Sequence, residues 1–205
     1  MPRPRVVVVD YGMGNLHSVA KGLERAGAQV TVSSRPRDVL RAEKLVVPGV
    51  GAVGAAMGEL HRRGLVGPIR QYLTEERPFL GICLGLQLLF ERSYEEGEHE
   101  CLGVLAGDVV LFEPVAGRIK VPHMGWNQLQ MAPGVPLFRD IPQGAYVYFN
   151  HSYYVRPEPE VIAAQTDYGR RFCSAVCRGL LFATQFHPEK SQKVGLQLLA
   201  NFVSL

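Results

Sequence analysis

The sequence is poor in cysteine and tryptophan and has no long apolar segment at its start. It contains four cysteines and one tryptophan among 205 residues. The cysteines are irregularly spaced, which excludes a disulfide framework of the kind found in small secreted domains. The N-terminal apolar run, residues 6–9, is too short for a signal-peptide core or a membrane span. These absences predict a cytoplasmic protein with no membrane contact.

A strong excess of charge of one sign is also missing. The 22 basic and 19 acidic residues leave a formal charge of +3, and no basic stripe is interleaved with aromatic residues. Nucleic acid is therefore not expected as a partner. Hydrophobic residues make up 47% and charged residues 20%, which is typical of a globular protein. The length fits a single domain spanning residues 1–205.

No pattern in the sequence requires a metal or an organic cofactor. Cys173 and Cys177 fall within an expected strand, and their spacing predicts that both lie on one face. No second pair of cysteines or histidines at zinc-binding spacing lies nearby. Both residues are therefore expected to be buried core thiols.

The first half alternates short apolar runs with helical patterns. Strands are expected over residues 6–9, 29–32, 44–47 and 79–83. Helices are expected from the cap Asn15 to Gly27, from 54 to 76 with breaks near Gly64 and Gly67-Pro68, and over 84–90. This alternation predicts an α/β fold with a mostly parallel sheet and helices on both of its faces.

The second half is dominated by strands. They are expected over residues 108–112, 146–155, 161–166, 172–177 and 181–186, with several pairing antiparallel. Ser191 is expected to cap a closing helix in which Val194, Leu198 and Phe202 recur at helical spacing.

Cys83 lies between an apolar strand and an apolar helix, with Gly81 and Gly85 two positions away on either side. This pattern is typical of a nucleophile elbow, whose sharp turn needs small neighbours and exposes the side chain at the carboxyl end of the sheet. The backbone N–H of Leu84 is then a natural donor to developing negative charge. Packing alone can also require such glycines, so a matching general base is needed to distinguish a catalytic cysteine from a buried structural one.

His187 supplies that base in the pattern. It ends an apolar strand, so it is expected at the same sheet edge as Cys83, and Glu189 two residues later can orient its imidazole. A nucleophile, a base and an orienting acid are thereby predicted. Among the other histidines, His61 and His99 are expected on the surface and His17 on the first helix. The remaining two, His123 and His151, lie beside suspected loops.

Three short motifs resemble the class I, triad-type glutamine amidotransferases. They are GICLGLQ at residues 81–87, HPE at 187–189 and PGVG at 48–51. The resemblance covers nearly the whole chain and implies that family's single-domain, flavodoxin-like α/β fold. DYGMGN at residues 10–15, KVPHMGWN at 120–127 and HPEKS at 187–191 are more specific, and they resemble the glutaminase subunits of imidazole glycerol phosphate synthases.

The resemblance implies a reaction and a set of roles. Cys83 attacks the side-chain amide of glutamine, His187 protonates the departing ammonia, and water hydrolyses the thioester to glutamate. The substrate-binding residues implied are Gln87, Gly51, Ser152 and Tyr153. An oxyanion hole is implied at Val50, Gly51 and Leu84, with a backbone that reorients when a partner docks.

The same resemblance implies a partner. It is a cyclase subunit with a (β/α)₈ barrel, which forms a heterodimer with the glutaminase and uses its ammonia in histidine biosynthesis. The expected products are imidazole glycerol phosphate and an aminoimidazole carboxamide ribotide. Asn15, Trp126, Tyr148 and Lys190 lie in or near the specific motifs and are candidates for the docking face, with ordinary surface packing as their alternative explanation.

Three alternatives remain open at this point. Residues 49–54 satisfy G-x-G-x-x-G, the pattern of dinucleotide-binding turns, but Pro48 intervenes and the preceding strand is third instead of first. A noncatalytic subunit could keep the fold without the chemistry, although all three positions of the catalytic triad are filled. Finally, the triad itself is compatible with the glutaminase of another biosynthetic pathway.

Overall fold

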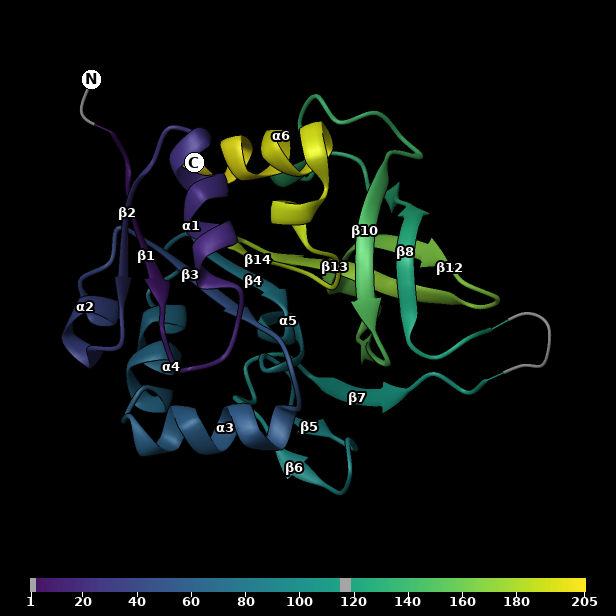
Figure 1. Cartoon of the computed structure of the whole chain (residues 1–205), viewed down its shortest axis with the longest axis horizontal. Helices are drawn as coiled ribbons and strands as arrows, with labels where there is room; N and C mark the ends of the chain where they lie inside the picture. The colour runs from purple at the N-terminus through teal and green to yellow at the C-terminus, as the bar shows by residue number, and fades with distance from the viewer. Residues whose placement is uncertain (1–2, 115–118) are drawn as a thin grey trace.

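The computed structural model describes residues 3–114 and 119–205, and an eight-stranded sheet forms its centre (Figure 1). The strand order is β2-β1-β3-β4-β14-β13-β12-β9. The bounds of these strands are β1 (Arg5–Val9), β2 (Gln29–Ser33), β3 (Lys44–Gly49), β4 (Phe79–Cys83), β9 (Gln130–Met131), β12 (Ile162–Asp167), β13 (Arg171–Arg178) and β14 (Leu181–Thr184). The strands from β2 to β14 run parallel, and β13, β12 and β9 extend the sheet antiparallel. The expected mostly parallel sheet is confirmed.

Helices cover both faces of this sheet, as the alternating pattern predicted. One face carries α1 (Leu16–Arg25) and α6 (Gln192–Val203), and the other carries α2 (Pro36–Leu40), α3 (Val53–Arg62) and α4 (Val66–Thr74) (Figure 1). Each face has its own apolar core, because a parallel strand buried on both sides needs apolar cover on both.

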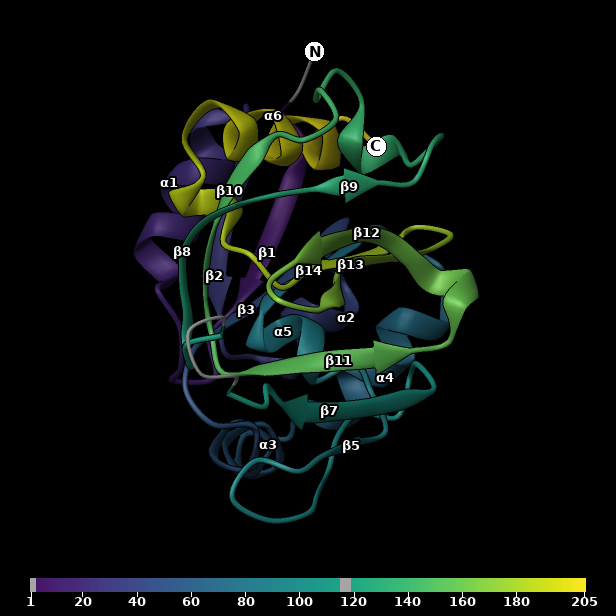
Figure 2. The ribbon, with the colours of Figure 1, turned by 90° about the vertical axis from the view of Figure 1, so that its right-hand side faces the viewer.

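Two smaller sheets come from the second half of the chain. One has the order β11-β7-β5-β6 and the other pairs β10 with β8. Their bounds are β5 (Arg92–Ser93), β6 (His99–Glu100), β7 (Gly107–Leu111), β8 (His123–Gln128), β10 (Tyr146–His151) and β11 (Tyr153–Pro157). Figure 2 shows β11 and β7 side by side below the central sheet.

The strand expected over residues 146–155 is wrong as a single element. The strand is interrupted at Ser152, and the segments before and after it, β10 and β11, belong to different sheets. Buried residues alternate from Tyr146 to His151, but Tyr154 and Val155 are both buried, so the period-2 pattern itself ends there. Strand β8 was missed because its alternation is inverted: Met124 and Trp126 are exposed, whereas the polar His123 is buried.

The helix expected over residues 84–90 is also shorter than predicted. Helix α5 spans only Leu84–Gln87, and hydrogen bonds from Leu89 N to Leu86 O and from Phe90 N to Gln87 O tighten the chain after it. Every residue from 84 to 90 is buried, so periodicity could not mark the helix end. The five-residue helix α2 was missed.

The break between α3 and α4 falls at Gly64, as predicted, where φ is +65°. The second predicted break, at Gly67-Pro68, is wrong. Both residues lie in the first turn of α4, where the missing proline N–H has no intrahelical partner to lose. The cap at Asn15 is confirmed, since its side chain accepts a hydrogen bond from Ser18 N at 3.3 Å.

Cys173 and Cys177 are not on one face of β13, contrary to the prediction. A bulge between β12 and β13 shifts the register around Ser174. As a result Cys173 is buried in the core beneath α3 and α4, whereas Cys177 is partly buried against the core on the other face.

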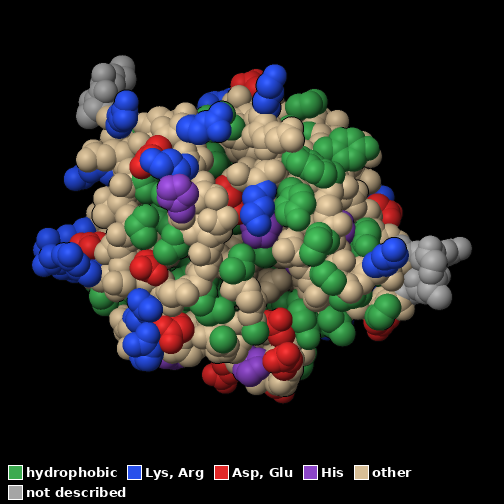
Figure 3. Space-filling model, viewed as in Figure 1, with side chains coloured by type: hydrophobic (Ala, Val, Ile, Leu, Met, Phe, Trp, Pro, Cys, Tyr) green, Lys and Arg blue, Asp and Glu red, His purple; other side chains and the backbone are tan. Residues whose placement is uncertain are grey.

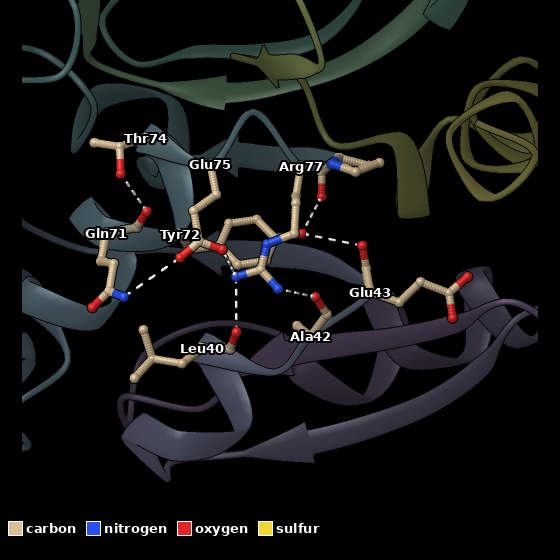
Figure 4. Close-up of polar contacts among 9 residues, drawn as sticks. Leu40, Ala42, Glu43, Gln71, Tyr72, Thr74, Glu75 and Arg77 are labelled. Carbon is tan, nitrogen blue, oxygen red and sulfur yellow. Dashed lines mark hydrogen bonds and ion pairs between the residues drawn. The ribbon is translucent and has the colours of Figure 1, made fainter.

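Arg77 links α2 and α4 at the end of the sheet where β4 begins (Figure 4). Its guanidinium donates to Leu40 O at 2.8 Å and to Ala42 O at 2.9 Å, and it lies 4.1 Å from the centre of the Tyr72 ring. The Tyr72 hydroxyl in turn donates to Pro78 O at 2.8 Å. These contacts join α2, α4 and the start of β4, at the end of the sheet opposite Cys83.

Gly85 should be irreplaceable because a Cβ there would collide with the carbonyl oxygen of Val47 on β3. Replacing Gly85 with alanine is expected to lower the free energy of unfolding by about 2 kcal/mol or more, since neither backbone can move aside. Gly58 in α3 is the matched control: it has open space around it, and Gly58→Ala should raise the free energy of unfolding by about 0.5–1 kcal/mol. Urea denaturation measures both, and equal effects of the two substitutions would contradict this account.

Candidate active site

Cys83 occupies a strained turn between β4 and α5. Its φ of 54° and ψ of −103° are rarely adopted by a residue with a side chain, and the neighbours explain how the turn is held. A Cβ on Gly81 would lie 2.7 Å from Gly85 O, so α5 rests directly on the strand backbone. The turn therefore has the geometry of a nucleophile elbow, with the need for small neighbours that the sequence indicated.

A cavity of about 360 Å³ lies at this turn. Its lining residues come from the β3–α3 loop, from α5 and from the turn between β10 and β11; those predicted as oxyanion, nucleophile or substrate groups are Val50, Gly51, Cys83, Leu84, Gln87, Ser152 and Tyr153. The structure thus brings together residues that are up to about a hundred positions apart in the sequence. A larger cavity, of about 750 Å³, lies at the opposite end of the sheet beside Leu181 and contains no cysteine or histidine.

His187 lies within hydrogen-bonding reach of Cys83, which lines the cavity, and Glu189 pairs with it. His187 Nδ1 is 2.8 Å from Glu189 Oε1, and the two side chains are only 3% and 2% exposed. Strand β14 pairs with β4, so the residues that follow it reach the elbow. The carboxylate fixes the proton on Nδ1 and leaves Nε2 directed toward other groups.

The electrostatics of this group favour a charged imidazole. Burial alone disfavours the imidazolium, but the hydrogen bonds to Cys83 and Glu189, together with their charges, raise the pKa of His187 well above its ordinary value. A buried imidazolium between a sulfur and a carboxylate is suited to moving one proton at the sulfur. This is the chemistry of a nucleophile with its base.

Ser191 does not cap α6, contrary to the prediction. Its hydroxyl donates to His187 O at 2.7 Å and accepts from Tyr148 N at 3.0 Å. His187 N donates to Tyr148 O at 2.9 Å. The hydroxyl is therefore used to hold the His187 segment against β10 instead of completing the first turn of the helix.

The glycine segment that satisfies G-x-G-x-x-G forms one wall of the cavity. Gly49 pairs in register with Cys83, and a Cβ on Gly49 would collide with the buried hydroxyl of Tyr11. Gly51 has a φ of +94° and packs against Met13. The glycines thus bring backbone groups close to the sulfur, and their surroundings include the loop of the DYGMGN motif.

Glu95 and Gln185 are among the site residues that the sequence patterns did not predict. Glu95 lines the cavity and accepts a hydrogen bond from Val53 N at 2.7 Å, and burial raises the pKa of its carboxyl group. Gln185 is fully buried and its Nε2 lies 3.7 Å from Cys83 Sγ. Glu95 lies in the acidic stretch YEEGEHE, which is typical of solvated surface, whereas Gln185 interrupts a mainly apolar stretch and gave a usable signal.

His123 and His151 lie beside loops, as expected, at the start of β8 and at the end of β10, where they form a buried pair. His123 Nδ1 is 3.0 Å from His151 Nε2, and His151 Nδ1 is 2.8 Å from Tyr153 O. The His123 ring stacks on Phe149 and Tyr168. Burial lowers the pKa of His123 to about 4 and that of His151 to about 3.

The candidate docking residues fall in two places. Trp126 and Tyr148 are cross-strand neighbours with ring centres 6.0 Å apart, and Lys190 Nζ lies 5.7 Å from the Tyr148 ring. Met124 and Tyr146 extend this apolar surface, and Figure 3 shows hydrophobic side chains over the region of β8 and β10. Asn15 lies apart from them, at the start of α1.

A family model describes almost the entire chain. Residues 7–205 match the model of Glutamine amidotransferase class-I. The chain belongs to the class I glutamine amidotransferase family. Within that family, it is 52% identical to the imidazole glycerol phosphate synthase subunit HisH of Rhodopirellula baltica over 97% of both chains. It is also 52% identical to subunit HisH of Syntrophotalea carbinolica, covering 96% of this chain and 98% of that one.

Solved structures agree on the amidotransferase fold. A crystal structure of a glutamine amidotransferase superimposes with a TM-score of 0.74 at 19% identity, covering 97% of this chain and 99% of that one. PurLQS from Thermotoga maritima gives a TM-score of 0.74 at 18% identity and covers 99% of each chain. At such low identity the likeness establishes the fold alone.

Residues 3–114 and 119–205 hold neither a candidate metal cluster nor a candidate membrane-spanning helix. No cluster of three or more His, Cys, Asp or Glu side chains in this part of the chain is arranged to hold a metal ion. None of its helices is long and apolar enough to cross a membrane.

His123 and His151 should both be neutral at pH 6, with the proton on Nδ1 in each ring. The carbonyl of Tyr153 can only accept, so His151 Nδ1 must donate to it and His151 Nε2 must accept from His123. Because both pKa values lie far below 6, imidazole ¹⁵N spectra should show neutral Nδ1–H tautomers at pH 6. An imidazolium signal from either ring at that pH would contradict the buried arrangement.

Proposed function

We propose that this amidotransferase is the glutaminase subunit of an imidazole glycerol phosphate synthase. It hydrolyses glutamine to glutamate and ammonia, and it passes the ammonia to a cyclase subunit that makes imidazole glycerol phosphate and an aminoimidazole carboxamide ribotide. The pathway assignment is supported by the identity of about half of all residues with HisH subunits over nearly the full length. The observation that carries the chemistry is Cys83 at a strained elbow beside the His187–Glu189 pair.

The proposed reaction has two halves. The proton shared by Cys83 and His187 is held on His187 Nε2, and the sulfur attacks the carboxamide carbon of glutamine as a thiolate. The resulting oxyanion accepts hydrogen bonds from the backbone N–H groups of Leu84 and of the Val50–Gly51 segment, both of which line the cavity. His187 returns the proton to the leaving nitrogen, the C–N bond breaks, and ammonia departs from a γ-glutamyl thioester.

The second half restores the free enzyme. A water molecule gives a proton to His187 and attacks the thioester carbon, and collapse of the intermediate breaks the C–S bond. The sulfur leaves as a thiolate beside the protonated His187, and glutamate is released. Glu189 holds the imidazole throughout, at 2.8 Å from Nδ1, and stabilises its charged form.

The cavity offers complementary groups for the rest of glutamine. The Glu95 carboxylate is its acidic side chain and suits the substrate α-ammonium. Backbone groups of Ser152 and Tyr153 bind the α-carboxylate of the substrate glutamine, and Gln87 contacts the side-chain amide of the substrate. The cavity volume of about 360 Å³ is adequate for an amino acid of this size.

The surface formed by Met124, Trp126, Tyr146 and Tyr148 is the proposed docking face for the cyclase. Trp126 is 46% exposed and Met124 61% exposed, which is unusual for large apolar side chains outside an interface. Lys190 adds a cation beside Tyr148 and follows the triad residue Glu189 directly. We assign the partner a (β/α)₈ barrel and the complex a one-to-one heterodimer, in which Asn15 also contacts the cyclase.

Replacing Cys83 with alanine should abolish ammonia release, with a fall in kcat of more than about a thousandfold, because no other group can form the thioester. Cys177→Ala is the matched control, since that thiol lies on β13 and does not line the cavity, and it should leave kcat unchanged. Coupled glutamate detection measures both. Glutamine hydrolysis retained by Cys83→Ala would remove the nucleophile from its proposed role.

Addition of the cyclase subunit with its nucleotide ligand should stimulate glutamine hydrolysis by this chain. The reason is that docking reorients the Val50–Gly51 backbone and completes the oxyanion hole, which is expected to be worth roughly a hundredfold in kcat. Trp126→Ala should weaken the complex and require more cyclase for the same stimulation. If hydrolysis were as fast without the cyclase as with it, or were stimulated only by a synthase of another pathway, the assignment to histidine biosynthesis would fail.

A further inference from the structure

Gln185 is a fully buried amide that the catalytic scheme above does not use. It follows β14 and precedes His187 by two residues, and its backbone N donates to Ser174 O at 2.9 Å. A side-chain amide at 0% exposure is costly to bury unless its donors and acceptor are matched. Its partners are Gln87 and the sulfur of Cys83.

The orientation of the Gln185 amide is fixed by the backbone carbonyl of Tyr153, through the side chain of Gln87 that lies between them. Gln87 Nε2 lies 3.1 Å from Tyr153 O, which can only accept, so this end of the Gln87 side chain is the NH₂ group. The same NH₂ group lies 3.2 Å from the Gln185 amide, whose near atom must therefore be the oxygen. The Gln185 NH₂ group is left to point at Cys83 Sγ, 3.7 Å away.

The histidine pair constrains the same carbonyl from its other side. His151 Nδ1 donates to Tyr153 O at 2.8 Å, and His151 Nε2 accepts from His123. Asn127 Nδ2 lies 3.3 Å from His123 Nε2 and completes the series. The hydrogen bonds thus connect β8 through Tyr153 O and Gln87 to Gln185, whose amide contacts the sulfur. In each of these hydrogen bonds only one of the two groups can be the donor.

We propose that Gln185 is a positioning residue for the nucleophile: its amide N–H donates to Cys83 Sγ and its amide oxygen holds the Gln87 side chain. This inference rests on the proposed function, because it assigns Gln185 to the glutaminase reaction. The donor stabilises negative charge on the sulfur while the proton is held on His187. Because the amide is neutral and keeps its own protons, it does this without competing for the proton or disturbing the pairing of His187 with Glu189.

Two substitutions separate the two halves of this role. Gln185→Glu keeps an oxygen for Gln87 but removes the N–H at sulfur and adds negative charge there. Gln185→Met has a similar shape and removes both the donor and the acceptor. Both should lower kcat by roughly tenfold or more. Only Gln185→Met, which releases Gln87, should also raise KM for glutamine.

The direct readout is alkylation of Cys83 by iodoacetamide, followed by mass spectrometry across a range of pH. In both variants the pH profile of alkylation should move upward by about one unit, because the thiolate has lost a donor. A merely structural role would not move this profile. Gln197→Met is the matched control, since Gln197 lies on α6 and pairs with Asn201 away from the cavity, and it should leave the profile and kcat unchanged.

The results discriminate between this inference and the function on which it rests. An alkylation profile identical to that of the parent protein in folded Gln185→Met would overturn the role of Gln185, while the glutaminase assignment would stand. Loss of cooperative unfolding in both Gln185 variants would assign the residue to stability alone and would also overturn it. Activity retained in Cys83→Ala would instead remove the proposed nucleophile and the whole reaction with it.

Discussion

The backbone turn at Cys83 is the constraint on which the site depends. A residue with a side chain is held at a φ of 54°, and only the dense packing of α5 onto β3 and β4 keeps it there. Gly81 and Gly85 make that packing possible because a Cβ on either would meet backbone. The strain places the sulfur at the carboxyl edge of a central strand, with the backbone N–H groups of the following turn around it.

The neighbouring strands supply the rest of the chemistry. Strand β14 pairs with β4 on one side and brings Gln185, His187 and Glu189 to the sulfur, while β3 pairs with it on the other and brings the glycine segment. The turn at Ser152 between two small sheets closes the cavity. Sheet order therefore converts distant stretches of sequence into one site, and the apolar surface of β8 and β10 adjoins it through Ser191 and Tyr148.

Much of the fold was readable because its signals are local. The parallel strands are short β-branched runs buried on both faces, and the cap at Asn15 and the break at Gly64 are features of single residues. The predictions were wrong where tertiary packing, and not the local sequence pattern, decided the structure. Residues 84–90 are all buried and hid the end of α5, the bulge at Ser174 moved Cys173 and Cys177 to opposite faces, and Ser191 bonded to tertiary neighbours instead of its own helix.

The sequence by itself identified the family and predicted the candidate reactive residues. Gly81, Cys83, Gly85 and the His187–Glu189 segment are identifiable because a sharp turn and a proton-transfer pair restrict residue type at fixed spacing. Only the tertiary structure decided which polar groups surround them. Glu95, Gln185 and the His123–His151 pair reach the site from separate elements, and their protonation and orientation follow from burial and from carbonyls contributed by other strands. Hydrogen bonding between residues far apart in the chain has no periodicity for a sequence to display.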